Sequence, residues 1–173
     1  MKKIIFICAF VFSTLGFSQN TTIDNLVTDF ERNKTMTLTY IDAMPEDQFD
    51  FKPTEGVRTF AEQMLHLAQG TIRLSANGSG EPPIYGDKNI EKEAAFQSKT
   101  EVKRLVTESF DFAIAGLQNM DDSKLEEAVE RGPFNVSRIG WIQKASEHMV
   151  HHRGQCAIYL RLKGITPPDY KLF

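Results

Sequence analysis

The sequence predicts an all-α protein folded as a four-helix bundle. Four segments repeat apolar residues at spacings of three and four, which is the period of a helix with one buried face. No segment alternates apolar and polar residues in the way that a half-buried strand does. Behind a predicted leader, about 155 residues remain, enough for one domain with a single core. Four helices in one domain bury their apolar faces by packing against one another.

Residues 1–18 are predicted to be a signal peptide. Two lysines precede an apolar run at 4–17, about fourteen residues long and shorter than the roughly twenty that span a bilayer. We expect cleavage after Ser18, leaving a domain of residues 19–173 that is periplasmic or secreted and has no stable membrane span. The alternative is an uncleaved membrane anchor.

Charge and cysteine content argue against nucleic-acid binding and against an intrachain disulfide. The net charge is −3, and it becomes about −5 when two lysines leave with the leader. No basic stripe is present, so we expect no nucleic-acid partner. Only Cys156 remains after cleavage, which rules out an intrachain disulfide.

The first helix is expected from Thr21 to Pro45. Its start carries Thr21-x-x-Asp24, a weak variant of the capping box. The apolar stripe comprises Ile23, Leu26, Val27, Phe30, Leu38, Ile41 and Met44. Residues 45–58, with two prolines and a glycine, are then predicted to form a loop.

The second helix is expected from Thr59 to about Leu74. Thr59-x-x-Glu62 is a full capping box, and His66 lies near the middle of the helix with Gln63 and Gly70 on its face. The following residues, 76–97, are rich in Gly and Pro, and so long a loop in a compact domain usually has a purpose. This connection is long enough to travel the length of the bundle, as it must if the second and third helices are parallel.

The third helix is expected to begin at Ser98, where Ser98-x-x-Glu101 is another capping box. A loop containing Gly132 and Pro133 follows it. The fourth helix is the longest, from about Ser137 to Lys163, and is closed by Gly164 with two prolines beyond.

The positions of the histidines indicate a candidate metal site. His148 and His152 are four residues apart and therefore lie on one helix face, and His66 of another helix could supply a third ring. Three neutral imidazoles suit a divalent transition metal and leave coordination positions open for water or substrate. Zinc, nickel, iron and copper all fit this ligand set. The alternative is a buried polar pair, His148 and His152, hydrogen-bonded to neighbouring Gln or Tyr side chains.

Other polar residues near this face are assigned different roles. His151 is rotated away, so we expect it at the rim and not among the ligands. Cys156, one turn after His152, is expected in the core rather than on the metal. Glu62 precedes His66 by four residues and could reach the edge of the site.

Three further residues are candidates for contact with an anionic substrate. Thr35, Lys52 and Arg153 could each make such a contact, and solvated surface is the preferred interpretation of all three.

Two blocks of the chain carry a resemblance. One is MPEDQFDFKPTEGVRTFAEQMLH, which ends at His66, and the other is ASEHMVHHRGQCAIYLRLKGITPPDY, which holds His148 and His152. Both resemble the DinB-like superfamily of helical metal-binding proteins. The resemblance implies an up-down-down-up bundle, a metal held by these three histidines, with zinc or nickel foremost, and a homodimer.

The resemblance also bears on activity. Characterised relatives include thiol-dependent transferases that use bacillithiol, mycothiol or glutathione, and a maleylpyruvate isomerase. The transferases are cytoplasmic, whereas the predicted leader directs this chain out of the cytoplasm. We therefore expect a metal-dependent hydrolase or thiol S-transferase acting on a small molecule. The alternative is a non-catalytic module of the same fold that binds metal or a small ligand.

Overall fold

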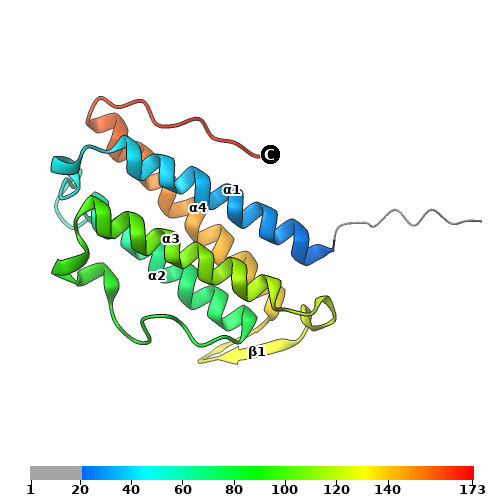
Figure 1. Cartoon of the computed structure of the whole chain (residues 1–173). Helices are drawn as coiled ribbons and strands as arrows, with labels where there is room; N and C mark the ends of the chain where they lie inside the picture. Colours follow the sequence, from blue (N-terminus) through cyan, green and yellow to red (C-terminus); the bar gives the residue numbers. More distant parts are fainter. Residues whose placement is uncertain (1–20) are drawn as a thin grey trace, which may run out of the picture.

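The computed structural model describes residues 21–173, and these form a four-helix bundle (Figure 1). Its helices are α1 (Thr22–Ala43), α2 (Phe60–Ser79), α3 (Lys99–Gln118) and α4 (Arg138–Leu162). The predicted all-α bundle is therefore confirmed. The predicted signal peptide, residues 1–18, lies outside the described residues. Among residues 21–173, no helix is both long and apolar enough to cross a membrane.

The helix starts follow the local signals in the sequence. Thr21 and Thr59 each form a complete capping box, in which the threonine accepts from the N–H three residues later and the acidic residue there accepts in return. Ser98 accepts a hydrogen bond from the Glu101 N–H, but the Glu101 carboxylate pairs with Arg104. The capping box predicted at α3 is thus only half formed.

The predicted end of α2 at about Leu74 is wrong, because the helix continues to Ser79. The residues Ala-Asn-Gly-Ser at 76–79 resemble a loop in sequence, yet they pack against α4. A Cβ at Gly78 would lie 2.7 Å from the Ile142 side chain, so glycine is required where the two helices touch. Gly80 then ends the helix in the left-handed conformation, with φ +86°.

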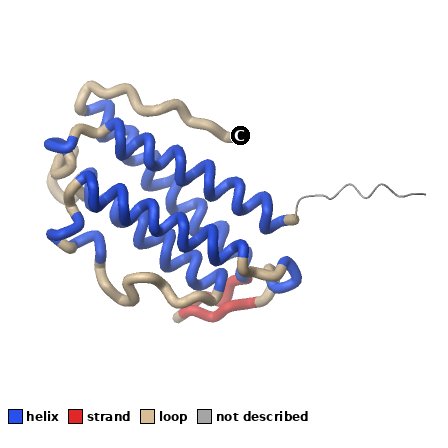
Figure 2. The backbone as a smooth tube through the Cα atoms, viewed as in Figure 1, coloured by secondary structure: helices blue, strands red, loops and turns tan. Residues whose placement is uncertain are grey.

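The helices run up, down, down and up. Figure 1 shows α1 and α4 running in one direction and α2 and α3 in the other, so that α2 and α3 are parallel. The segment between them returns along the bundle from the end of α2 to the start of α3 (Figure 2). It contains two short 3₁₀ helices, η2 (Ile90–Lys92) and η3 (Ala94–Phe96). The expectation of a long crossing connection is confirmed.

A small β-hairpin before α4 was not predicted. Strands β1 (Ala128–Arg131) and β2 (Phe134–Ser137) pair antiparallel, with Gly132 at φ +55° in the turn. The predicted loop is therefore partly a two-stranded ribbon. Most of its residues are exposed, which explains why the sequence shows no alternation of apolar and polar positions there.

The core is apolar and centred on α2, which packs against both α3 and α4. Its largest fully buried side chains include Phe30, Phe60 and Phe110, each contributing about 2 kcal/mol by burial. Between α1 and α4 the buried side chains include polar ones. There the fully buried Arg153 of α4 donates from Nη1 to Oδ1 of Asn33 at 2.8 Å and to Oγ1 of Thr37 at 3.4 Å.

Candidate metal centre

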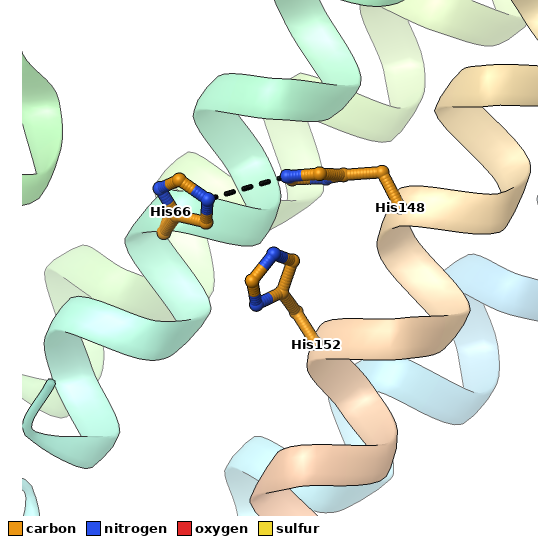
Figure 3. Close-up of side chains that lie close together, drawn as sticks. All are labelled: His66, His148 and His152. Atoms are coloured by element: carbon orange, nitrogen blue, oxygen red, sulfur yellow. Dashed lines mark hydrogen bonds between the residues drawn. The ribbon is translucent and has the colours of Figure 1, made fainter. Parts of the chain in front are cut away.

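Three histidines converge where the middle of α2 faces α4 (Figure 3). His66 projects from α2, and His148 and His152 project from successive turns of α4. One nitrogen from each ring lies within 4.8 Å of the other two. The Nε2 atoms of His66 and His148 are 3.3 Å apart. The structure thus brings together the three residues that the sequence singled out.

The separation of the His66 and His148 nitrogens suits a small divalent ion. Metal–imidazole bonds of 2.0–2.1 Å in tetrahedral geometry place neighbouring ligand nitrogens about 3.3 Å apart. The His66–His148 distance equals that value. Neutral nitrogen donors without a carboxylate or thiolate among them are compatible with zinc, nickel, iron or copper. The residues present therefore fit a divalent transition metal.

His66 is oriented by a carboxylate from the long connection. Oε2 of Glu91 lies 2.8 Å from Nδ1 of His66, and Oε1 accepts a hydrogen bond from Arg58 Nε, also at 2.8 Å. Nη2 of Arg58 lies 3.1 Å from the same Nδ1, but a guanidinium can only donate. The shorter contact to a carboxylate favours a proton on Nδ1, which leaves the lone pair of Nε2 directed at the cluster. Metal-binding histidines are commonly oriented in this way.

The two histidines of α4 differ in their outer contacts. Nδ1 of His152 lies 3.0 Å from the side-chain amide of Gln63. If that amide presents its oxygen, Nδ1 donates to it and Nε2 is free to bind an ion. His148 has a buried Nδ1 with no hydrogen-bond partner among residues 21–173. Its orientation must therefore come from packing.

Burial keeps these rings uncharged. Burial, with a smaller effect of the neighbouring imidazoles, lowers the pKa of His148 to about 4 and that of His152 to about 3. Burial also lowers the pKa of His66, although its hydrogen bond to Glu91 opposes this. Burial alone would raise the pKa of Glu91, but the hydrogen bonds from Arg58 and His66 outweigh that effect and hold it below its ordinary value. At neutral pH the site therefore offers three imidazole lone pairs beside a carboxylate.

Gly70 makes room for the His148 ring. It lies one turn after His66 on α2, and a Cβ built at this position would be only 2.1 Å from Cε1 of His148 and 2.4 Å from its Nδ1. Any other residue would push the ring away. Glycine is required here by close approach, although its backbone is ordinary helix.

A pocket of about 750 Å³ opens beside the cluster and is lined by His152 but not by His66 or His148. Its other walls come from the connection before α2, from α2 itself, from the long crossing connection and from α4. Two of the cations around it are paired, Arg58 with Glu91 and Lys92 with Glu62. Lys52 also lines it and forms no ion pair within residues 21–173.

The other candidate residues near the site fall in different places. His151 is exposed at the pocket rim and outside the cluster, as expected. Cys156 is fully buried in the core, where burial raises the pKa of its thiol. Glu62 reaches the pocket but pairs with Lys92 rather than with a histidine.

Of the three candidates for anion contact, only Lys52 lies at the pocket. Thr35 is exposed on α1, where its hydroxyl donates to the Glu31 carbonyl. The preferred assignment of Arg153 to solvated surface is wrong, because its side chain is enclosed between α1 and α4.

Sequence reasoning missed Glu91, Arg58 and the steric role of Gly70. Glu91 lies in a connection without helical periodicity, so no spacing rule links it to His66. The length of that connection was the available signal, since long ordered loops often carry functional residues. Gly70 was recognised only as a residue on the same face as His66.

Comparison with known proteins identifies relatives over most of the chain. The family model of the DinB superfamily matches residues 29–156. The uncharacterized protein YjoA of Bacillus subtilis is 23% identical over 146 residues, which cover 83% of this chain and 92% of YjoA.

Solved structures share the fold. A DinB-like protein from Bacillus cereus superposes with a TM-score of 0.74 at 17% identity, covering 88% of this chain and all of that protein. The structure of Bacillus subtilis YjoA gives a TM-score of 0.66 at 21% identity, covering 84% of this chain and 96% of YjoA. A conserved protein from Enterococcus faecalis gives 0.63 at 14% identity, covering 83% of this chain and 98% of that one.

Proposed function

The chain belongs to the DinB superfamily, and from that premise we propose that it is a metal-dependent enzyme acting on a small molecule. The observation that carries the proposal is the cluster of His66, His148 and His152, of which His152 lines an open pocket. These residues would hold a divalent transition metal, with zinc or nickel foremost and iron or copper as alternatives. Such an ion lowers the pKa of a bound water or thiol and so makes it a nucleophile at neutral pH.

The protein residues around the cluster have separate tasks in this proposal. Glu91 and Gln63 orient the rings of His66 and His152, and Gly70 admits the ring of His148. Open coordination positions distinguish a catalytic site from a structural one. The pocket beside His152 supports access of a small molecule to those positions, and this favours an enzyme over a non-catalytic binding module.

Lys52 supports a substrate with a negative charge. The other two cations of the pocket are neutralised by Glu91 and Glu62, whereas Lys52 keeps its charge available at the rim. A carboxylate or phosphate group on the substrate would pair with it.

The proposed reaction is hydrolysis or thiol transfer, and the proposed location is the periplasm or the exterior of the cell. The location depends on the predicted signal peptide at residues 1–18. Low-molecular-weight thiols are abundant in the cytoplasm, so export favours water over a thiol as the nucleophile.

Metal content is the first test. Elemental mass spectrometry of the purified protein should find about one equivalent of a transition metal. His148→Ala should lose this metal because two ligands hold such an ion poorly. His151→Ala is the matched control, since it removes an exposed histidine three residues away and should keep the metal. Full metal stoichiometry in His148→Ala would show that the site is wrong.

Activity is the second test. Metal-loaded protein should be assayed on panels of small esters, amides and electrophiles that carry a carboxylate or phosphate, with and without added thiol. Turnover that requires the metal but no thiol identifies a hydrolase, and turnover that requires both identifies a thiol transferase. A loaded protein that binds panel members without turning any over would instead identify the non-catalytic module.

A further inference from the structure

The pocket beside the histidine cluster has one aliphatic side chain among polar ones. Within the described part of the chain, the residues that line it are mostly charged or carry amides or imidazoles, and the aliphatic one is Val57. Val57 is 44% exposed, and no other exposed large apolar residue among 21–173 lines this pocket. A single exposed valine is ordinary on a protein surface, so its meaning depends on how the chain holds it.

Val57 belongs to a loop that is closed at its base. We call residues 52–57 the pocket loop. The N–H of Phe60, after the loop, donates to the carbonyl of Phe51, before it, at 2.9 Å. The loop itself makes no backbone–backbone hydrogen bond with any described residue. Its ends are therefore held together, whereas its middle can adjust to a bound molecule.

The end of the loop next to α2 is fixed to the pocket wall. The Arg58 side chain donates to Glu91 at 2.8 Å, and the Arg58 carbonyl accepts a hydrogen bond from the Tyr159 hydroxyl of α4 at 2.8 Å. On the other side of Val57, Gly56 has φ +81°, a conformation that glycine adopts without strain. Val57 thus lies between a glycine turn and a fixed arginine, and these two neighbours keep it at the pocket.

The same loop carries the cation of the pocket that has no ion pair. Lys52 lines the pocket and pairs with no carboxylate among the described residues, whereas a carboxylate balances each of the other two cations. Lys52 and Val57 are five residues apart. One loop therefore presents a positive charge and an apolar surface to the same pocket.

We propose that the pocket loop selects the substrate, with Lys52 pairing with an anionic group and Val57 contacting an apolar one. The substrate class is then a carboxylate or phosphate that bears an alkyl or aromatic group, rather than a wholly polar anion. This inference rests on the proposed function, because it takes the pocket to be the substrate site. Val57 is a specificity-determining residue in it, since apolar surface that is buried on binding stabilises the complex in proportion to its area.

Binding of a graded series of phosphonates tests this selection. Methyl-, propyl- and hexylphosphonate share one anionic group and differ in apolar length. Isothermal titration of the purified protein should show affinity rising about twofold for each added methylene, since full burial of a methylene contributes up to about fourfold. Titrations with and without bound zinc separate this chain-length dependence from any binding of the phosphonate group to the metal.

Four variants divide the two contributions. Val57→Ser should remove the chain-length dependence and change the affinity for methylphosphonate little, and Val57→Ile should keep the dependence. Lys52→Met should weaken binding of every member about tenfold without changing the dependence. Val150→Ser is the matched control, because it alters an exposed valine of α4 that does not line the pocket. Circular dichroism confirms that each variant keeps its helices.

Nuclear magnetic resonance detects the contact directly. The methyl signals of Val57, identified by their absence from Val57→Ser, should shift with hexylphosphonate and much less with inorganic phosphate. Failure of every phosphonate to bind overturns the proposal, and so does a chain-length dependence that Val57→Ser retains. The dependence requires no turnover, so its presence in a protein without activity supports the pocket loop while the proposed activity fails. Turnover without the dependence overturns the role of Val57 alone.

Discussion

His152 and Arg153 are neighbours in the chain, yet they belong to two polar clusters of different kinds, one partly buried and one fully enclosed. The histidine cluster (His66, His148, His152) lies between α2 and α4, and the arginine cluster (Arg153, Asn33, Thr37) lies between α1 and α4. The histidines adjoin an open pocket, and their lowered pKa values keep them neutral at pH 7. The arginine is enclosed, forms no ion pair within residues 21–173, and has Nη2 without a hydrogen-bond partner.

The difference shows that burial of a polar group does not by itself indicate a functional site. Arg153 donates its shortest hydrogen bond to Asn33 and so links α4 to α1. Its enclosed side chain is not accessible to a ligand. The histidines instead direct one ring nitrogen each at a common point beside the pocket, within 4.8 Å of one another. The arginine cluster therefore affects folding, and the histidine cluster affects binding. Three predictions test this separation.

The largest effect is expected at Asn33. Asn33→Ala removes the closest acceptor of a buried guanidinium, and leaving such a charge without a partner costs about 3 kcal/mol of folding free energy. Chemical denaturation of the metal-free protein measures this loss, and metal stoichiometry should not change. Asn33→Asp is the matched control, because it keeps an oxygen acceptor and adds the missing negative charge. Equal destabilisation by both variants would contradict this role for Asn33.

The next effect is expected at Gly70. In Gly70→Ala the new Cβ occupies the space of the His148 ring, so metal affinity should fall by about a hundredfold. Competition with a coloured chelator measures the affinity. Gly116→Ala, whose Cβ would meet only Ser79 between α2 and α3, should bind metal normally. Normal binding by Gly70→Ala as well would mean that His148 is not a ligand.

The smallest effect is expected at Glu91. Glu91→Gln keeps an acceptor for Nδ1 of His66 but removes the negative charge, so metal affinity should fall about tenfold while stability of the metal-free protein changes little. Glu62→Gln is the control, because that carboxylate lines the pocket without touching a histidine. If both variants bind metal equally well, the link from Glu91 to the site is refuted.

Sequence predicted those parts of the fold and site that local patterns determine. The caps at Thr21 and Thr59 and the shared face of His148 and His152 depend on residues within one or two turns. The end of α2 was predicted too early because contact with Ile142 on another helix, rather than local propensity, keeps residues 76–79 helical.

The parts that the sequence did not predict depend on contacts across the fold. Arg153 was assigned to the surface because of its charge, and only packing against α1 encloses it. Glu91 reaches His66 across 25 residues through a connection whose path the neighbouring helices determine. No periodicity in the sequence encodes such a path.

That connection also limits how the chain can be rearranged. Its first residues, 80–83, are exposed, whereas Ile90 is buried and its N–H donates to Gln69, immediately before Glu91 reaches His66. New termini made by circular permutation, or an inserted peptide, should be tolerated at 80–83, where little holds the backbone. The same operation after Asn89 would separate Glu91 from the site. The connection thus has two parts. The first tolerates insertions and new termini, whereas the second must keep its length because it places Glu91 at His66.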